Sequence, residues 1–418
     1  MKNVKTVLNE VLKEIEPDEK YQKEMFKRIN EIIIKINRGL KDANAVLGGS
    51  GAKGTWLKTF DADIFVLFDY RKYNSRSQEL SDILEIILKK NFNGLRKLHG
   101  SRDYFQLKHG NFTFEIVPIL KITKAEQAKN ITDVSPLHSR WVLRHKKLAS
   151  EMKLAKQFCK ANNLYGAESH LRGFSGYVCE ILSVHYGSFI NILKNAAKWQ
   201  EKTLIDVEKY YRRQDVFKII NTSKLASPLI VIDPVQKDRN AAAALSLEKF
   251  SDFKVAAAKF LRKPSKDFFR PKRLMDKFLK GKIGNRNLIM VKLSALDGKS
   301  DIAGSKIVKA YEFFIRELEK NEFKIIKKGL EFQDSAATAC FLFGKKGLEK
   351  TRLVEGPPLK LSQHVLNFKK LHKKTFKKNG KIVALEKRKF TKAEELLKKI
   401  SKENYVKERC KSVKIKAI

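Results

Sequence analysis

Cysteine is scarce in this chain, and long apolar runs are absent from it. The 418 residues include four cysteines, at positions 159, 179, 340 and 410, and their wide spacing fits no metal-ligand pattern. We therefore expect buried, reduced thiols in a cytoplasmic protein. Because no run of about 18 apolar residues occurs, we expect no membrane-spanning helix. Residues 1–16 also lack the apolar core of a signal peptide.

Acidic residues are outnumbered almost two to one by basic residues. The sequence holds 88 Lys and Arg against 46 Asp and Glu, which gives a formal net charge of +42. Such a surface attracts polyanions and carries more charge than solubility requires, so we expect a nucleic acid as partner rather than a membrane. Hydrophobic residues make up 43% of the chain, enough for buried cores, and the length suggests roughly two to four domains.

Helical and extended patterns mix over the first 125 residues. Apolar residues at helical spacing predict two helices over residues 3–38, divided at Pro17-Asp18. A further helix is expected over residues 80–92. The predicted strands lie at residues 45–47, 61–68, 104–108 and 112–122. The last two are joined by His109-Gly110-Asn111, which is typical of a tight turn, so this part predicts an α/β or α+β unit.

The middle of the chain is mostly helical, and the last third is mixed and basic. Residues 145–262 predict long helices at 177–199 and 241–261 around a short strand at 229–232, and residues 263–266 are expected to form a linker. The last third predicts a strand, a helix and two strands, an order that suits a ferredoxin-like sandwich. These elements are expected at residues 288–293, 305–321, 324–332 and 337–343.

A loop is expected at residues 355–358, and a basic tail follows over residues 369–416. Four aromatic residues accompany this tail, namely Phe368, Phe376, Phe390 and Tyr405. Aromatic rings among cations can stack on bases while lysines bind phosphates. The same rings can equally pack inward beneath a solvated charged surface.

Two aspartates in a predicted strand carry the strongest chemical signal. Asp61 and Asp63 are two residues apart, so their carboxylates point to one face of the strand and repel each other unless a cation lies between them. Oxygen ligands of this kind favour Mg²⁺. Glu115, in another predicted strand, is the candidate for a third ligand of a two-metal site. Such a pair also suits a solvated edge strand, but the glycine-rich segment 49–55 can approach phosphate closely and favours the metal site.

These residues resemble a known signature. Gly49-Ser50, Lys53-Gly54-Thr55-Trp56-Leu57 and Asp61-Ala62-Asp63 look like the motif of the DNA polymerase β-like nucleotidyltransferases. Residues 163–180 and the segment from Val231 to Asn240 narrow the resemblance to the archaeal (class I) CCA-adding enzymes. The resemblance spans roughly residues 45–245. It implies an α+β fold in which a palm-like mixed sheet with helices precedes a helical domain and a C-terminal α+β RNA-binding region.

The resemblance also implies an activity, a domain division and a set of site residues. The implied activity is template-independent addition of CCA to tRNA from CTP and ATP, by two-metal chemistry with Mg²⁺, in a homodimer. The implied domains are a catalytic domain at 1–140, a helical neck at 141–262 and a basic, tRNA-binding body and tail at 263–418. The implied catalytic and metal-binding carboxylates are Asp61, Asp63 and Glu115. The implied nucleotide-binding residues are Ser50, Lys53, His138, Lys156, Tyr165 and Arg239.

Three positions depart from the family pattern, and two other functions stay open. Ala62 stands where a β-branched residue is usual, Glu115 where Asp is usual, and Lys53 where Arg is common. The longer Glu115 moves its oxygens by about 1.5 Å, and Lys53 keeps the charge without a bidentate contact. A poly(A)-polymerase-like or oligoadenylate-synthase-like enzyme would share the same catalytic unit. An RNA-binding protein with a degenerate catalytic fold is the non-enzymatic alternative.

Overall fold

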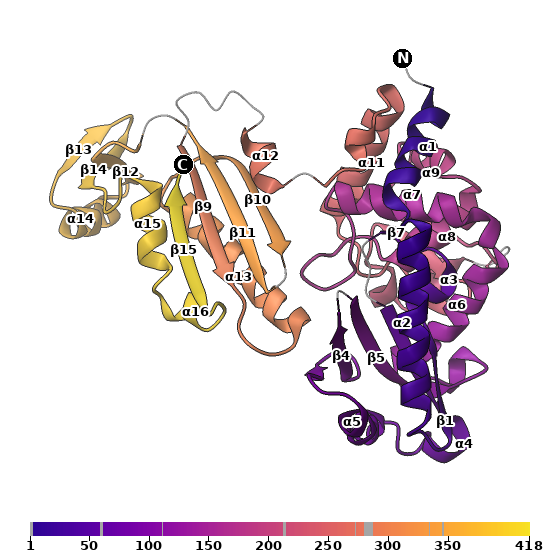
Figure 1. The fold of residues 1–418 in the computed structure, drawn as a ribbon. Helices are drawn as coiled ribbons and strands as arrows, with labels where there is room; N and C mark the ends of the chain where they lie inside the picture. Colours follow the sequence, from indigo (N-terminus) through magenta and orange to yellow (C-terminus); the bar gives the residue numbers. More distant parts are fainter. Residues whose placement is uncertain are drawn as a thin grey trace. The chain divides into compact units, whose positions relative to one another are not determined.

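The chain is described by a computed structural model, which covers residues 3–58, 62–110, 112–211, 215–271, 273–279, 287–333, 335–344 and 347–418. Its contacts divide the chain into two units, residues 1–272 with 298–301 and residues 273–297 with 302–418. Figure 1 labels most elements of both units. Each unit has hydrophobic cores of its own.

Two helices open the first unit, as the sequence predicts. α1 (Val4–Ile15) and α2 (Glu19–Asn37) are divided at Pro17, and the Asp18 side chain caps α2 by accepting a hydrogen bond from a backbone N–H. The apolar face of α1 packs into a core of helices, whereas that of α2 packs into the core of a sheet. The N-terminal arm is therefore anchored in two cores of the same unit.

That sheet is mixed and has the strand order β1-β2-β5-β4-β3. Its strands are β1 (Ala43–Leu47), β2 (Ala62–Asp69), β3 (Arg96–Leu98), β4 (Tyr104–His109) and β5 (Phe112–Lys121). The parallel pair β2 and β5 forms its centre, and β4 and β5 form the predicted hairpin, whose residue 111 lies outside the described residues. The connecting helices are α3 (Gly49–Lys53), α4 (Tyr70–Tyr73) and α5 (Leu80–Asn91). The predicted helices and the other strands of this part are confirmed.

The rest of the first unit is mostly helical, as expected. Its helices are α6 (Ser135–Arg144), α7 (Ala149–Ala161), α8 (Gly176–Tyr186), α9 (Phe189–Ala196), α10 (Val216–Ile219) and α11 (Leu247–Arg262). A small sheet of β6 (Thr203–Ile205), β7 (Leu229–Asp233) and β8 (Gln236–Asn240) lies among them. β7 confirms the predicted strand. Phe158, Phe189 and Phe260 are buried in the shared core, where their rings meet edge to face.

Two long helices predicted in this part are wrong in extent. The stretch 177–199 is broken into α8 and α9, because Gly187 adopts a left-handed conformation (φ +73°) at the end of α8 and Ser188 caps α9. The helix predicted from residue 241 begins at Leu247 instead. Ser246 caps it by accepting from the backbone N–H of Lys249, and the alanines before it form turns. The cap at Ser246 therefore sets the start of this helix, although alanines before it favour helix.

The second unit contains a four-stranded antiparallel sheet in the order β10-β11-β9-β15. It is built from β9 (Asn287–Ser294), α13 (Ser300–Lys320), β10 (Ile325–Gln333), β11 (Ala336–Phe343), α15 (Ala393–Ile400) and β15 (Ser412–Ala417). This order is that of a ferredoxin-like sandwich, and it confirms the predicted elements. α13 and α15 pack on one face of the sheet, and α12 (Leu274–Leu279) contributes to a core on the other.

A smaller antiparallel sheet is inserted between β11 and α15. It consists of β12 (Thr351–Pro358), β14 (Lys381–Lys387) and β13 (Thr375–Lys378), with α14 (Ser362–Leu371) packed on β12. The loop expected at residues 355–358 is therefore wrong: these residues belong to β12. An edge strand tolerates Pro357 and Pro358 because its outer N–H groups need no partner, and the register shifts between Glu355 and Pro358.

The aromatic residues of the basic tail have different surroundings. Phe376 is exposed, whereas Phe390 packs against the core of the larger sheet. Tyr405 contacts Phe313 and lies beneath the guanidinium of Arg409. Only the first of these three rings is open enough to stack on a base.

The expectations drawn from cysteine and apolar runs agree with the fold. All four cysteines are buried and unpaired by disulfides. Across the residues that the structure describes, no helix is both long and apolar enough to cross a membrane.

Candidate active site

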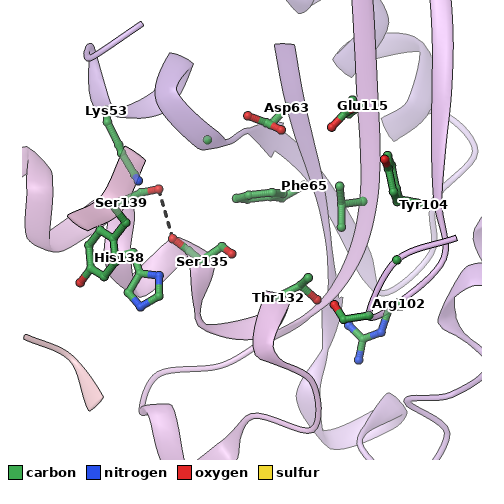
Figure 2. Close-up of a pocket in the computed structure, with 15 residues that line it drawn as sticks. Lys53, Asp63, Phe65, Arg102, Tyr104, Glu115, Thr132, Ser135, His138 and Ser139 are labelled. Carbon is green, nitrogen blue, oxygen red and sulfur yellow. Dashed lines mark hydrogen bonds between the residues drawn. The ribbon is translucent and has the colours of Figure 1, made fainter. Parts of the chain in front are cut away.

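Asp63 and Glu115 meet on the two central strands of the first sheet. β2 and β5 run parallel with Asp63 in register with Glu115, so both side chains point to the same side of the sheet. Figure 2 shows the two carboxylates next to each other above a cavity that both residues line. This cavity has a volume of about 380 Å³. Asp61, the third predicted carboxylate, lies outside the described residues.

The glycine-serine segment forms the short helix α3 beside Asp63. The N–H of Gly48 donates to the carbonyl of Asp63 at 2.7 Å, which fixes the start of the segment against β2. Gly49 has φ +52°, and a Cβ atom there would lie 1.6 Å from Asp63 Oδ2. Only glycine fits this approach. Ser50 is partly buried in α3 but does not line the cavity, whereas Lys53, at the other end of α3, does.

Lys53 and Lys156 share a buried carboxylate that was not among the predicted site residues. Glu180, on α8, accepts from Lys53 Nζ at 2.9 Å through Oε2, and from Lys156 Nζ at 2.6 Å through Oε1. Thr55 Oγ1 also donates to Oε1, at 2.7 Å. Burial alone would raise the pKa of Glu180, but the two ammoniums outweigh it and lower the pKa to about 2. We call these four residues the Glu180 cluster.

The two lysines of the Glu180 cluster differ in their access to the cavity. Lys156 is buried, and its ammonium also donates to Thr55 Oγ1 at 2.8 Å and to the Thr55 carbonyl at 3.3 Å. Its three N–H groups thus have three acceptors, and it does not line the cavity. Burial lowers the pKa of Lys156. Lys53 lines the cavity and lies 5.3 Å from the ring centre of Tyr177.

A second buried carboxylate, Asp233, contacts two further predicted nucleotide-binding residues, His138 and Arg239. Asp233 Oδ2 lies 3.1 Å from His138 Nε2 and accepts from Arg239 at 2.6 Å, while Oδ1 accepts from the Tyr177 hydroxyl at 3.2 Å. The rings of His138 and Tyr177 are stacked with centroids 4.0 Å apart. We call these four residues the Asp233 network. His138 and Tyr177 line the cavity, and Arg239 does not.

Burial and nearby charges shift the pKa values of His138 and Asp233 in opposite directions. Burial lowers the pKa of His138, although the Asp233 carboxylate partly opposes this effect, so the ring is neutral at pH 7. Burial would raise the pKa of Asp233, but the hydrogen bond from His138 and the charge of Arg239 leave it below its usual value. The network therefore holds an ionised aspartate that is bound by a permanently charged guanidinium.

Tyr165 is placed near Lys156 and not on the cavity. It packs at the start of α8, where a Cβ atom on Gly176 would lie 2.6 Å from its hydroxyl and 3.4 Å from Lys156 Cε. Burial raises its pKa strongly, and Lys160 Nζ lies 5.1 Å from its ring centre. Its assignment to the nucleotide pocket stays a prediction, as do those of Ser50, Lys53, His138, Lys156 and Arg239.

The opposite wall of the cavity was not foreseen from the sequence. Arg102, Tyr104 and Thr132 line it, as Figure 2 shows. Arg102 is held by a buried ion pair with Asp133 at 2.6 Å and by the Pro118 carbonyl at 3.0 Å. Arg102, whose guanidinium is bound by Asp133, and Tyr104 therefore line the cavity on the side opposite Lys53 and His138.

The donor set of the cavity suits a hard cation. Within the described ranges, which omit Asp61, no group of three or more His, Cys, Asp or Glu side chains is close enough to hold a metal ion. The adjacent carboxylates of Asp63 and Glu115 supply oxygen ligands and no sulfur or imidazole, which fits Mg²⁺ better than a softer metal.

The nucleotidyltransferases are defined by a mixed sheet with paired carboxylates, a glycine-serine helix against them and an attached helical domain. These enzymes usually use divalent metal ions. Residues 27–138 match the family described as nucleotidyltransferase domain. Residues 150–270 match the second domain of tRNA nucleotidyltransferase, and residues 285–413 match the C-terminal domain of CCA-adding enzyme.

Two curated relatives extend these matches over most of the chain. The CCA-adding enzyme of Nanoarchaeum equitans is 38% identical over 314 residues, which are 75% of this chain and 76% of that protein. That of Methanocaldococcus jannaschii is 32% identical over 416 residues, 95% of this chain and 90% of that protein. The chain belongs to the family of archaeal CCA-adding enzymes.

Solved structures agree with the fold. A cytoplasmic RNA terminal U-transferase superposes with a TM-score of 0.51 at 14% identity, covering 65% of this chain and 99% of that one. A poly(U) polymerase bound to MgATP gives a TM-score of 0.51 at 15% identity, covering 64% and 98%. At such low identity these likenesses support the fold class alone.

Proposed function

We propose that this chain adds the sequence CCA to the 3′ end of tRNA, without a nucleic-acid template, by transferring nucleotides from CTP and ATP. The observation that carries this function is the register of Asp63 with Glu115 beside a cavity that also presents Lys53 and His138. Family membership over most of the chain supports tRNA as the substrate. In each step the 3′ oxygen of the RNA bonds to the α-phosphorus as the bond to pyrophosphate breaks.

Asp63 and Glu115, together with Asp61, are the residues that would hold Mg²⁺. Bound there, the metal would lower the pKa of the attacking hydroxyl and neutralise charge on the leaving pyrophosphate. The protein contributes by holding the carboxylates: β2 and β5 are central strands, and Gly49 leaves room for Asp63 Oδ2. Positioning and charge stabilisation then supply most of the catalysis.

The wall formed by α3, α6 and α8 would bind the nucleotide. Lys53, with Ser50 in the same helix α3, would neutralise the charge of the triphosphate. Lys156 would add a second positive charge behind Lys53, through its contact with Glu180. His138 would contact the nucleotide as a neutral ring, and Arg239 would read the base with the N–H groups that Asp233 leaves free. Tyr165 lies beside Lys156 and does not line the cavity, and we assign it to the nucleotide-binding residues together with that lysine.

The second unit would bind the body of the tRNA. Its exposed lysines on α14 and β13, such as Lys369, Lys377 and Lys378, suit phosphate contacts, and the exposed ring of Phe376 lies among them. RNA helices are recognised mainly by shape and backbone. We also propose a homodimer, which sedimentation equilibrium of the full chain tests directly.

Nucleotide addition to defined tRNAs tests the proposed function. Transcripts that end before CCA, after the first C or after CC would be incubated with Mg²⁺ and labelled CTP or ATP. We expect two C additions, then one A, and no further growth. Asp63→Asn should abolish incorporation without unfolding the protein. Long tails of A would instead identify a poly(A)-polymerase-like enzyme, and wild-type activity in Asp63→Asn would overturn the site assignment.

A further inference from the structure

Glu180 joins parts of the first unit that are far apart in sequence. It lies on α8 in the stretch Val178-Cys179-Glu180-Ile181-Leu182, whose other members are buried and apolar. Its partners come from α3, from the loop after α3 and from α7, which are Lys53, Thr55 and Lys156. Lys53 is 127 residues away in the chain, and Lys156 is 24 residues away. One carboxylate thus connects the nucleotidyltransferase sheet region with the helical part.

The charges of the Glu180 cluster do not cancel. Two ammoniums and one carboxylate leave one positive charge, and the exposures of the side chains show where this charge can act. The side chain of Lys53 is 12% exposed, against 5% for Lys156 and none for Glu180. Lys53 is also the lysine of the cluster that lines the cavity. The excess positive charge is therefore presented to the cavity by Lys53.

A lysine side chain alone is a poor anchor for a phosphate, because its stem is flexible and must be ordered on binding. The Glu180 cluster removes that freedom in advance. Oε2 holds the ammonium of Lys53 at 2.9 Å, while Oε1 is fixed by Thr55 and Lys156. The ring of Tyr177 lies 5.3 Å from the same ammonium and limits its movement from another side.

We propose that Glu180 is a positioning residue for the triphosphate of the incoming nucleotide, because its carboxylate holds Lys53 and Lys156 together and fixes the Lys53 ammonium at the cavity. This inference rests on the proposed function and assigns the triphosphate side of that site. Glu180 itself does not line the cavity. It acts through Lys53, which separates its role from that of Asp63 and Glu115.

The test is the KM for CTP in a double-mutant cycle, measured with saturating tRNA that lacks CCA. Glu180→Gln keeps the size of the side chain but cannot accept from both lysines, so the KM should rise about tenfold or more while kcat changes less. Lys53→Gln should also raise the KM. If Glu180 acts through Lys53, the double variant should be no worse than Lys53→Gln alone.

Glu151→Gln is the matched control. Glu151 also loses one carboxylate charge within the helical part, but its Oε2 accepts from the backbone N–H of Phe189 and from none of the cluster lysines. The KM of Glu151→Gln for CTP should equal that of the unchanged protein. A wild-type KM in folded Glu180→Gln, or effects of Lys53→Gln and Glu180→Gln that multiply, would overturn the inference.

A further variant covers the case in which Glu180→Gln does not fold. Glu180→Asp keeps the charge beside Lys156 but is shorter by about 1.5 Å, so it cannot reach both lysines. It should fold, raise the KM, and show no added effect in combination with Lys53→Gln. A wild-type KM in Glu180→Asp would refute the positioning role. Failure of the unchanged protein to add CCA would overturn the proposed function first, so the two failures are distinguishable.

Discussion

Replacing Gly49 by alanine should disable the site with little effect on the fold. A Cβ atom at this position would lie 1.6 Å from Asp63 Oδ2, whereas an ordinary contact needs about 3.4 Å, so the carboxylate must move by roughly 1.5–2 Å. Metal–ligand distances tolerate about 0.2 Å, and a misplacement of about 1 Å can cost roughly 100-fold in rate. We therefore expect kcat to fall at least about 100-fold, with a smaller change in the KM for CTP.

Gly54→Ala separates this clash from backbone strain. Gly54 ends α3 with φ +69°, close to the φ of +52° at Gly49, but a Cβ atom there meets nothing within 4 Å. Both variants should lose about 1–2 kcal/mol of stability from the left-handed backbone, which thermal unfolding measures. Only Gly49→Ala should lose rate in single-turnover addition of CTP. Equal rates in the two variants would refute the link between Gly49 and Asp63.

Further predictions concern Asp233, Glu180, Ala62 and Glu115. Asp233→Asn should raise the KM for CTP and ATP by about ten- to 100-fold and increase UTP incorporation. The neutral amide loses the ion pair with Arg239, and its NH2 group cannot accept the hydrogen bonds that Oδ1 accepts from Tyr177 and Val235. Unchanged KM and selectivity would contradict this. The pKa of Glu180 is lowered from 4.5 to about 2, so the stability it contributes is present above pH 4.5 and is lost as the pH falls toward 2. Between pH 5 and pH 3 the melting temperature should thus fall further in the unchanged protein than in Glu180→Gln. Ala62→Val should lower the melting temperature and leave kcat unchanged. Glu115→Gln should lower kcat and leave the melting temperature unchanged. Thermal unfolding and CTP addition measure both quantities.

The sequence predicted the sheet that carries the carboxylates because its signals are local. Strand period, the turn at Gly110 and the break at Pro17 depend on neighbours within a few residues, and the strands predicted for this sheet lie within a few residues of their observed bounds. The errors have local causes as well. Gly187-Ser188 ends one helix and caps the next, and an edge strand accepted Pro357 and Pro358.

The two buried carboxylates of the site could not be predicted in the same way. Glu180 is a single charged residue in an otherwise apolar stretch of helix. This pattern indicates a buried charge, but it does not predict which residues pair with it. Those partners lie up to 127 residues away and meet it only in the folded chain. The same holds for Arg102 and Asp133, which are 31 residues apart. Pairings of this kind depend on how helices pack on the sheet, and periodicity contains no information about that packing.

Two departures from the family pattern lie on opposite faces of the same sheet. Ala62 is fully buried and stands in register with the buried Phe114, so the small side chain is matched by a large ring beside it on the core face. The next residues along β2 and β5, Asp63 and Glu115, point to the cavity. The Ala62 departure therefore affects packing, whereas the Glu115 departure affects the metal site. On each strand the core-facing residue directly precedes the cavity-facing one. β5 pairs with β2 on one side and β4 on the other, so its backbone cannot shift to compensate for the longer Glu115. Any adjustment must come from the side chain itself, which keeps the carboxylate charge while it changes the reach.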